Sequence, residues 1–344
     1  MTRAQTAANV SLAKGLEGRR VPFESIPVID LGPFLDGGDK PGVARAIGRA
    51  CREVGFFYIR NHGVPEAQIE AAFAAARRFF AQPLAAKTAI HVSKSYPTHR
   101  GYVPLFEENT DPEVTADLKE CFDLARELPP DHPEVRAGTP FHGPNVWPPG
   151  LPGFPDTVYG YYETVLELAL KLAGAIALSL DLPEDHFADK LDRAIANYRL
   201  IRYPPQQGRI EQETLGCGAH SDYGFLTVLA QGSVAGLQLR NCAGEWIAAP
   251  AIPGTFVVNI SELVERWTNG LYPATLHRVI NTSGRERYSM AFFLDTNYDA
   301  RIECLPSCRS PEHPAKYPPV IGGEYLFQRF DQTFPHRREP TRGA

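Results

Sequence analysis

Hydrophobic positions in the first ninety residues follow two different periods. Residues 26–31 (IPVIDL) and 56–64 (FFYIRNHGV) are short apolar runs that are typical of strands. Between them, residues 40–55 place apolar side chains at helical intervals and end on a glycine. A second helical pattern covers residues 65–83 and is bounded by proline on both sides. These patterns predict an α/β region at the start of the fold.

The pattern then changes twice. Residues 91–155 are dense in proline, glycine and aromatic residues without a regular period, which is typical either of loops that build a substrate site or of surface connectors. A continuous apolar stretch at 154–181 predicts a long helix buried against a sheet. From residue 197 onward, short β-type segments alternate with turn residues, interrupted by one short helix at 261–267. This spacing predicts an antiparallel sandwich or jelly roll.

Together these patterns divide the chain into four predicted segments. The 344 residues allow about two domains or one large enzyme. We expect a flexible N-terminal tail at 1–22, an α/β region with substrate loops at 23–150, a jelly-roll core at 151–335 and a C-terminal tail at 336–344.

Composition narrows the possible partners and the compartment. A formal net charge of −5 is mild for this length and argues against nucleic acid as a partner. The sequence has no apolar run that approaches the ~18 residues of a membrane span, and its start has no apolar core of the secretory kind. The six cysteines are scattered, which is typical of reduced thiols. We therefore expect a cytoplasmic protein with no membrane or nucleic-acid partner.

Two His-x-acid tripeptides are candidates for metal binding. About one such match is expected by chance in a chain like this, so the context has to decide between them. His132-Pro-Glu134 lies in a polar, proline-rich turn, whereas His220-Ser-Asp222 comes just before an apolar strand. In an extended chain, residues i and i+2 face the same side, so the second pair can aim at one point. His277, in another β-type segment, is the candidate third ligand.

Two histidines and one carboxylate leave open coordination positions, as in Fe(II) oxygenases, whereas a structural zinc site is filled by protein ligands. Each histidine taken alone is more typical of a hydrogen-bonded core or rim residue than of a metal ligand. Ten residues after His277, Arg287 and Ser289 share one face of an apolar strand. A buried arginine beside a hydroxyl group binds a carboxylate well, and Tyr203 can add a third donor. A surface salt bridge is the alternative for Arg287, but it fits this apolar run poorly.

The sequence resembles the Fe(II)/2-oxoglutarate-dependent oxygenases of the isopenicillin N synthase-like superfamily. The resemblance rests on the motifs at 220–222 (HSD), 277–279 (HRV) and 287–289 (RYS), and on the Tyr-Pro at 203–204. It extends from about residue 25 to about residue 330, because IPVIDL and REVGFFYIRNHGV look like the N-terminal domain of the same family. The segment GAHSDYG looks closer to bacterial and fungal members than to plant members.

This resemblance implies an α+β, mainly β fold, with a double-stranded β-helix (jelly-roll) core, flanking helices and an α/β N-terminal region. It implies oxidation of a small organic molecule, by hydroxylation or desaturation, with Fe(II), 2-oxoglutarate and O₂ and with release of succinate and CO₂. The implied iron ligands are His220, Asp222 and His277, and the implied partners of the far carboxylate of 2-oxoglutarate are Arg287, Ser289 and Tyr203. No catalytic side chain beyond this site is expected.

The resemblance also implies a substrate pocket lined by Thr98, Arg100, Tyr102 and Phe293. Tyr102 and Phe293 are also typical of ordinary packing residues, and Arg100 is equally typical of a surface position. The aromatic loops favour a small-molecule substrate.

Other functions remain open at this stage. One is an isopenicillin N synthase-like oxidase that uses no 2-oxoglutarate, in which Arg287 and Ser289 hold a substrate carboxylate. Another is fragmentation of 2-oxoglutarate itself, as in ethylene-forming enzymes. A metal hydrolase is a third, and a non-catalytic binding protein is disfavoured because it would not need the ligand set. We expect a monomer or a weak homo-oligomer.

Overall fold

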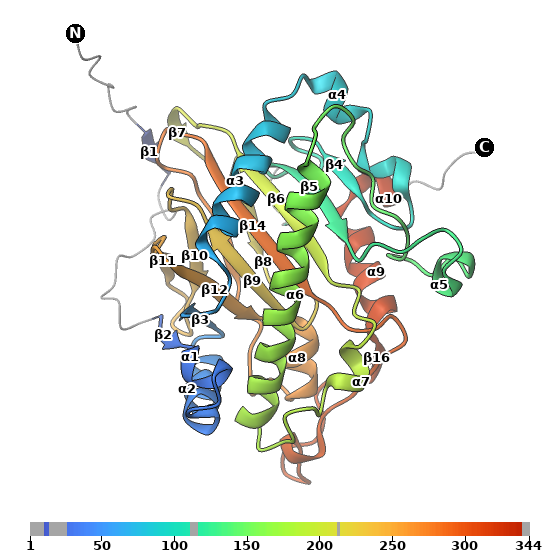
Figure 1. Ribbon diagram of the computed structural model, residues 1–344. Coiled ribbons are helices and arrows are strands. Elements are labelled where there is room, and N and C mark those ends of the chain that lie inside the picture. The colour runs from blue at the N-terminus through green and yellow to red at the C-terminus, as the bar shows by residue number, and fades with distance from the viewer. Residues whose placement is uncertain (1–9, 14–25, 111–115, 212–213, 339–344) are drawn as a thin grey trace.

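The computed structural model describes residues 10–13, 26–110, 116–211 and 214–338. Its centre is an eight-stranded sheet with a second, four-stranded sheet beside it (Figure 1). Neighbouring strands of both sheets pair antiparallel, except for the parallel pair at one edge. In spatial order, the large sheet contains β2 (Val28–Asp30), β3 (Phe56–Arg60), β12 (Thr255–Ile260), β9 (Leu226–Gln231), β14 (Arg287–Leu294), β6 (Asn197–Tyr203), β5 (Glu120–Ala125) and β4 (Gly101–Val103). The small sheet contains β11 (Trp246–Ala249), β10 (Leu237–Arg240), β13 (His277–Val279) and β8 (Cys217–His220).

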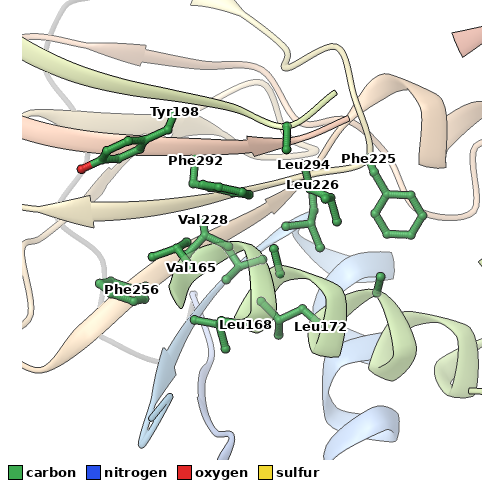
Figure 2. Close-up of a cluster of buried hydrophobic side chains, with 14 of the residues drawn as sticks. Val165, Leu168, Leu172, Tyr198, Phe225, Leu226, Val228, Phe256, Phe292 and Leu294 are labelled. Atoms are coloured by element: carbon green, nitrogen blue, oxygen red, sulfur yellow. The ribbon is translucent and has the colours of Figure 1, made fainter. Parts of the chain in front are cut away.

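One long helix covers one face of the large sheet. This helix, α6 (Phe154–Ser179), runs across the strands in Figure 1 and confirms the helix predicted at 154–181. In Figure 2 its side chains Leu168 and Leu172 lie among those of Val228 and Phe292 from the sheet. Two more helices, α2 (Lys40–Glu53) and α3 (Glu66–Phe80), pack against α6. This layer buries the larger hydrophobic core.

The apolar run in β14 contains two alternating faces. Met290, Phe292 and Leu294 belong to the core under α6, whereas Ala291 belongs to a second apolar cluster on the other side of the sheet. Because successive side chains of a strand point to opposite faces, Arg287 and Ser289 share the side of Ala291. That side lines an internal cavity.

Shorter elements complete the chain. The remaining helices are α1 (Gly32–Leu35), α4 (Leu84–Thr88), α5 (Pro133–Arg136), α7 (Ala188–Leu191), α8 (Glu262–Trp267), α9 (Gly322–Thr333) and α10 (Pro335–Arg338), with 3₁₀ turns at Val92–Ser95 and Pro306–Cys308. The remaining strands pair as β1 (Val10–Leu12) with β7 (Gly208–Ile210) and as β15 (Arg301–Ile302) with β16 (Val320–Ile321). None of the helices in the described ranges is both long and apolar enough to cross a membrane.

Described helices and strands fall within three of the segments expected to be irregular or terminal. The predicted tail at 1–22 contains β1, and the rest of that segment, apart from Ala13, lies outside the described residues. The predicted tail at 336–344 begins inside α10, and residues 339–344 lie outside the described residues. The region 91–155, expected to be irregular, contributes β4 and β5 to the large sheet. Strands on both sides of the boundary expected at residue 150 therefore share one sheet.

Candidate metal centre and cosubstrate site

The three predicted ligands converge on one point. His220 ends β8, and His277 begins β13 directly opposite it in the antiparallel pairing. The Nε2 atoms of His220 and His277 lie 3.7 Å and 3.6 Å from Oδ1 of Asp222. One ligand atom from each residue lies within 4.8 Å of the other two. Side chains that are 55 residues apart along the chain, at 222 and 277, thus form a group that can hold one metal ion.

Hydrogen bonds to the backbone orient both imidazoles. Nδ1 of His220 lies 2.8 Å from the carbonyl oxygen of Gly218, and Nδ1 of His277 lies 3.2 Å from that of Thr275. A carbonyl oxygen only accepts, so Nδ1 is the protonated nitrogen in both rings. Nε2 is therefore the atom of each ring that faces a metal ion, and orienting the ring in this way is the usual role of such supporting hydrogen bonds.

The two oxygens of the Asp222 carboxylate have different surroundings. Its Oδ2 accepts hydrogen bonds from Nδ2 of Asn259 at 2.7 Å and from Oγ1 of Thr227 at 2.5 Å, which leaves Oδ1 facing the imidazoles. Although burial alone would raise it, the pKa of Asp222 is lowered by His277, His220 and these hydrogen bonds. Burial lowers the pKa of His277 to about 4. Burial alone would also lower the pKa of His220, but Cys217 and Asp222 raise it to about 10. An ionised carboxylate and a neutral imidazole are the forms that bind metal ions. A metal ion that binds here therefore displaces a proton from His220.

Arg287 forms a second candidate site in the same cavity. Its side chain is buried at 1% exposure, and its Nη1 donates to Oγ of Ser289 at 3.3 Å. Its guanidinium carbon lies 4.7 Å from the ring centre of Tyr203, the residue opposite it in the pairing of β14 with β6. Nε and Nη2 have no hydrogen-bond partner among the described residues.

A buried guanidinium with two unsatisfied donors is costly unless an anion fills the place. A carboxylate accepts two parallel hydrogen bonds from such a group, so the far end of 2-oxoglutarate fits here. Oδ1 of Asp222 and the Nε2 atoms of His220 and His277 likewise suit a divalent iron ion that keeps open coordination positions. Both groups implied by the sequence are therefore compatible with the residues present.

Comparison with known proteins identifies the family. The model of the 2OG-Fe(II) oxygenase superfamily matches residues 192–296, and the model described as non-haem dioxygenase in morphine synthesis N-terminal matches residues 26–150. A 2-oxoglutarate-Fe(II) type oxidoreductase of Emericella nidulans is 36% identical over 316 residues, which cover 90% of each chain. This chain belongs to the 2OG-Fe(II) oxygenase superfamily. It is an oxidoreductase whose cofactors are Fe(II) and 2-oxoglutarate, as predicted.

Two further relatives have the same overall extent as this oxygenase. A homoarginine-6-hydroxylase of Glycine max is 36% identical, with 88% of this chain and 96% of the relative covered. A Neurospora crassa protein crystallised with alpha-KG and thymine has a TM-score of 0.77 at 29% identity, with 91% of this chain and 98% of that chain covered. The solved structures of the family confirm the predicted jelly-roll fold class.

The cavity of the oxygenase has two ends. On β14 the inward side chains are Arg287, Ser289, Ala291 and Phe293, and on β6 they are Tyr203, Ile201, Arg199 and Asn197. Tyr203 and Arg287 face each other at one end of these rows, and Asn197 and Phe293 face each other at the opposite end. At about 3.3 Å per residue, the rows separate the two ends by roughly 20 Å. We call the end at Tyr203 and Arg287, where a carboxylate fits, the cosubstrate end. The opposite end offers room for a second small molecule.

The four predicted substrate residues differ in whether they line the cavity. Phe293 lines the cavity, whereas Thr98, Arg100 and Tyr102 are not among the described residues that line it. Arg100 is completely buried and its guanidinium donates to the carbonyl oxygens of Thr98 at 2.5 Å and Phe141 at 2.6 Å, so the alternative of a surface role is also wrong. The hydroxyl of Tyr102 donates to Glu120 at 2.6 Å. These residues hold the fold, because backbone and carboxylate acceptors occupy the hydroxyls of Thr98 and Tyr102 and both Nη atoms of Arg100.

Several polar and aromatic residues of the cavity were missed by sequence reasoning. His99, which lies between Thr98 and Arg100, lines the cavity instead, because side chains of adjacent residues point in different directions. α9 and the residue after it supply aromatic walls, and this helix was not predicted from the sequence. The missed lining residues include His99, Glu108, Lys119, Asp123, Asn197, Arg199, Tyr223, Phe330 and Phe334.

Proposed function

We propose that this oxygenase hydroxylates or desaturates a small organic molecule, with 2-oxoglutarate and O₂ as cosubstrates and succinate and CO₂ as products. One oxygen atom of O₂ ends in succinate, and the other ends in the hydroxylated product or, on desaturation, in water. The observation that carries the proposal is that one cavity holds a metal-ligand group and a buried guanidinium whose Nε and Nη2 have no partner among the described residues.

In this proposal His220, Asp222 and His277 hold Fe(II), which supplies the activation of O₂ when it is bound. Arg287, with Ser289 and Tyr203, binds the far carboxylate of 2-oxoglutarate. The backbone hydrogen bonds at the two Nδ1 atoms and the donors on Asp222 keep the ligands in place, which avoids the cost of reorganising them during turnover.

The relatives support a small molecule as the substrate. One relative is a homoarginine-6-hydroxylase and another was crystallised with thymine, and both of these molecules are small and contain nitrogen. A cytoplasmic location and a monomeric or weakly homo-oligomeric state remain predictions from the sequence.

The test is to measure O₂ consumption and succinate release by the Fe(II)-loaded protein across a library of small molecules. We expect a low basal release of succinate that rises at least tenfold with a substrate, at one succinate per O₂. His277→Ala is the inactive control. Consumption of O₂ without succinate would instead indicate an oxidase of the isopenicillin N synthase type, and ethylene release would indicate fragmentation of 2-oxoglutarate.

A further inference from the structure

The cavity wall away from Arg287 contains a buried ionic network. Arg199 donates through Nε and Nη2 to the two oxygens of Asp123, at 2.6 Å and 2.8 Å. Its Nη1 reaches both oxygens of Glu108, at 2.9 Å and 2.8 Å. Lys119 lies 3.3 Å from Glu108 and donates to Asp117 at 2.8 Å. All five side chains are less than a tenth exposed.

This network carries an excess of negative charge. Glu108, Asp117 and Asp123 are three carboxylates, and Lys119 and Arg199 are two cations, which leaves one negative charge uncompensated. Burial lowers the pKa of the neighbouring His99 to about 4, so this ring adds no positive charge at neutral pH.

The rest of the described cavity lining does not remove this excess. Arg287 is the only other lysine or arginine among these residues, and it lies at the cosubstrate end. Asp295 also lines the cavity and adds no positive charge in either protonation state. The charges of Fe(II), Asp222, Arg287 and doubly ionised 2-oxoglutarate cancel one another. A filled cosubstrate end therefore leaves the cavity with a net negative charge.

His99 adds an unfilled acceptor beside the network. Its Nε2 lies 3.1 Å from Asp123, and because a carboxylate only accepts, Nε2 is the protonated nitrogen. Its Nδ1 therefore presents a lone pair, and this atom is buried with no partner among the described residues. A buried acceptor of this kind needs a donor, which an N–H group of a ligand can provide.

Aromatic rings gather around the same wall. Phe330 and Phe334 pack on His99, with ring centres 4.7 Å and 4.6 Å away, and line the cavity together with Phe293 and Tyr223. Aromatic rings attract cations, and the guanidinium of Arg329 already lies 4.4 Å from the ring centre of Tyr223. In contrast, a carboxylate placed here would lie against aromatic rings and the lone pair of His99. The charge of the nearby Arg199 is already neutralised by two carboxylates of the network.

We propose that the substrate of this oxygenase is a small organic cation, carrying an ammonium, amidinium or guanidinium group that binds at the wall formed by Glu108, Asp123, Arg199 and His99. The proposal rests on the proposed function, because the cosubstrate end must be occupied by 2-oxoglutarate. Carboxylic acids without a cationic group are excluded as substrates by the charge of this wall.

The test uses benzamidinium, benzamide and benzoate, which have nearly the same planar shape and differ in charge. Their binding to the Mn(II)- and 2-oxoglutarate-loaded protein is measured by calorimetry, since manganese prevents turnover. We expect benzamidinium to bind about tenfold more tightly than benzamide and more tightly still than benzoate, as expected for one unit charge across a small cavity. Equal binding of benzamidinium and benzoate, tighter binding of benzoate, or binding of neither would overturn the proposal.

Variants at Glu108 make the test specific. In Glu108→Gln the preference for benzamidinium over benzoate should fall about tenfold, whereas the charge-retaining Glu108→Asp should keep most of it. Glu303→Gln, a change at an exposed carboxylate, is the matched control and should keep the full preference. A preference that is unchanged in Glu108→Gln would overturn the proposal, and a fold check by thermal melting separates this result from unfolding.

The binding of 2-oxoglutarate to each manganese-loaded protein is measured first, without any probe. Failure of the wild-type protein at this step counts against the proposed function itself. Normal binding of 2-oxoglutarate without a preference for the cation counts against the cationic substrate alone.

Discussion

Asp222 shows how one side chain serves two purposes at the centre of the site. One of its oxygens is held by Asn259 and Thr227, and the other faces the two imidazoles. A substitution that removes this carboxylate therefore removes both a ligand and the group that compensates the charge of the metal. The same reasoning applies at the cosubstrate end, where two donor atoms of Arg287 have no acceptor in the part of the chain that the structure describes.

We expect Asp222→Ala to lose iron. The variant should retain less than about a tenth of the wild-type Fe(II) content after dialysis, because two imidazoles alone make a weak site for a hard divalent ion. Metal analysis of the anaerobic protein measures this. His132→Ala, in the other His-x-acid tripeptide, is the control and should keep its iron. Full iron content in Asp222→Ala would contradict the assignment.

Replacement of Arg287 should weaken the binding of 2-oxoglutarate. Arg287→Lys keeps the charge but loses the two parallel donors, so we expect the dissociation constant to rise roughly 10- to 100-fold. Calorimetric titration of the manganese-loaded protein with 2-oxoglutarate checks this. Ser289→Ala, which removes one neutral hydroxyl, should have a smaller effect. An unchanged affinity in Arg287→Lys would show that the cosubstrate binds elsewhere.

At the scale of single elements, β14 connects the core to the site, because one of its faces packs under α6 and the other lines the cavity. The apolar side chains of α6 therefore stabilise the strand that presents Arg287. Leu172 of α6 is completely buried, whereas Leu170 of the same helix is 38% exposed.

Leu172→Ala should lower the free energy of unfolding by about 2–5 kcal/mol, through lost burial and the cavity left behind. Leu170→Ala should change it by less than about 1 kcal/mol. Urea unfolding followed by circular dichroism compares the two variants. Equal losses would mean that α6 does not pack as described.

The ionic network around Glu108 makes the stability of the fold depend on pH. Burial alone would raise the pKa of Glu108, but Arg199 and Lys119 lower it to about 2. A carboxyl group whose pKa is lowered by folding stabilises the fold at neutral pH, and this stabilisation is lost as the pH falls from about 4.5 toward 2.

We therefore expect the melting temperature of the wild-type protein to fall steeply below pH 5. The melting temperature of Glu108→Gln should be lower at neutral pH and should fall less steeply. Thermal melts between pH 3 and pH 8 measure both slopes. The same slope in both proteins would contradict this role of Glu108.

At the scale of the whole molecule, the main architecture could be predicted because it depends on patterns that the sequence displays. The run of α6 and the strands from residue 197 onward have clear apolar periods, and the ligand motifs lie on them. In contrast, β5 was missed because its buried Glu120 and Asp123 look like surface residues until Lys87 and Arg199 are seen beside them. Partners that are distant in sequence explain such positions, and no local pattern contains them.

Local backbone geometry explains why the metal ligands could be predicted and the substrate residues could not. The i, i+2 spacing of His220, which ends β8, and Asp222, just after it, predicts that both face one point, whereas no periodicity decides which of residues 98–100 faces inward. In the structure His99 has a left-handed backbone (φ 58°) and faces the cavity, while Arg100 points into the protein. Only tertiary packing settles such a choice.

Anaerobic titration of the protein with Fe(II) and 2-oxoglutarate tests the central claim most directly. If His220, Asp222 and His277 hold one iron ion to which the cosubstrate binds, a weak visible charge-transfer band should appear only when both are present and saturate at one of each per chain. The band should be absent in His277→Ala. Its absence in the wild-type protein, or its persistence at full strength in His277→Ala, would contradict the account.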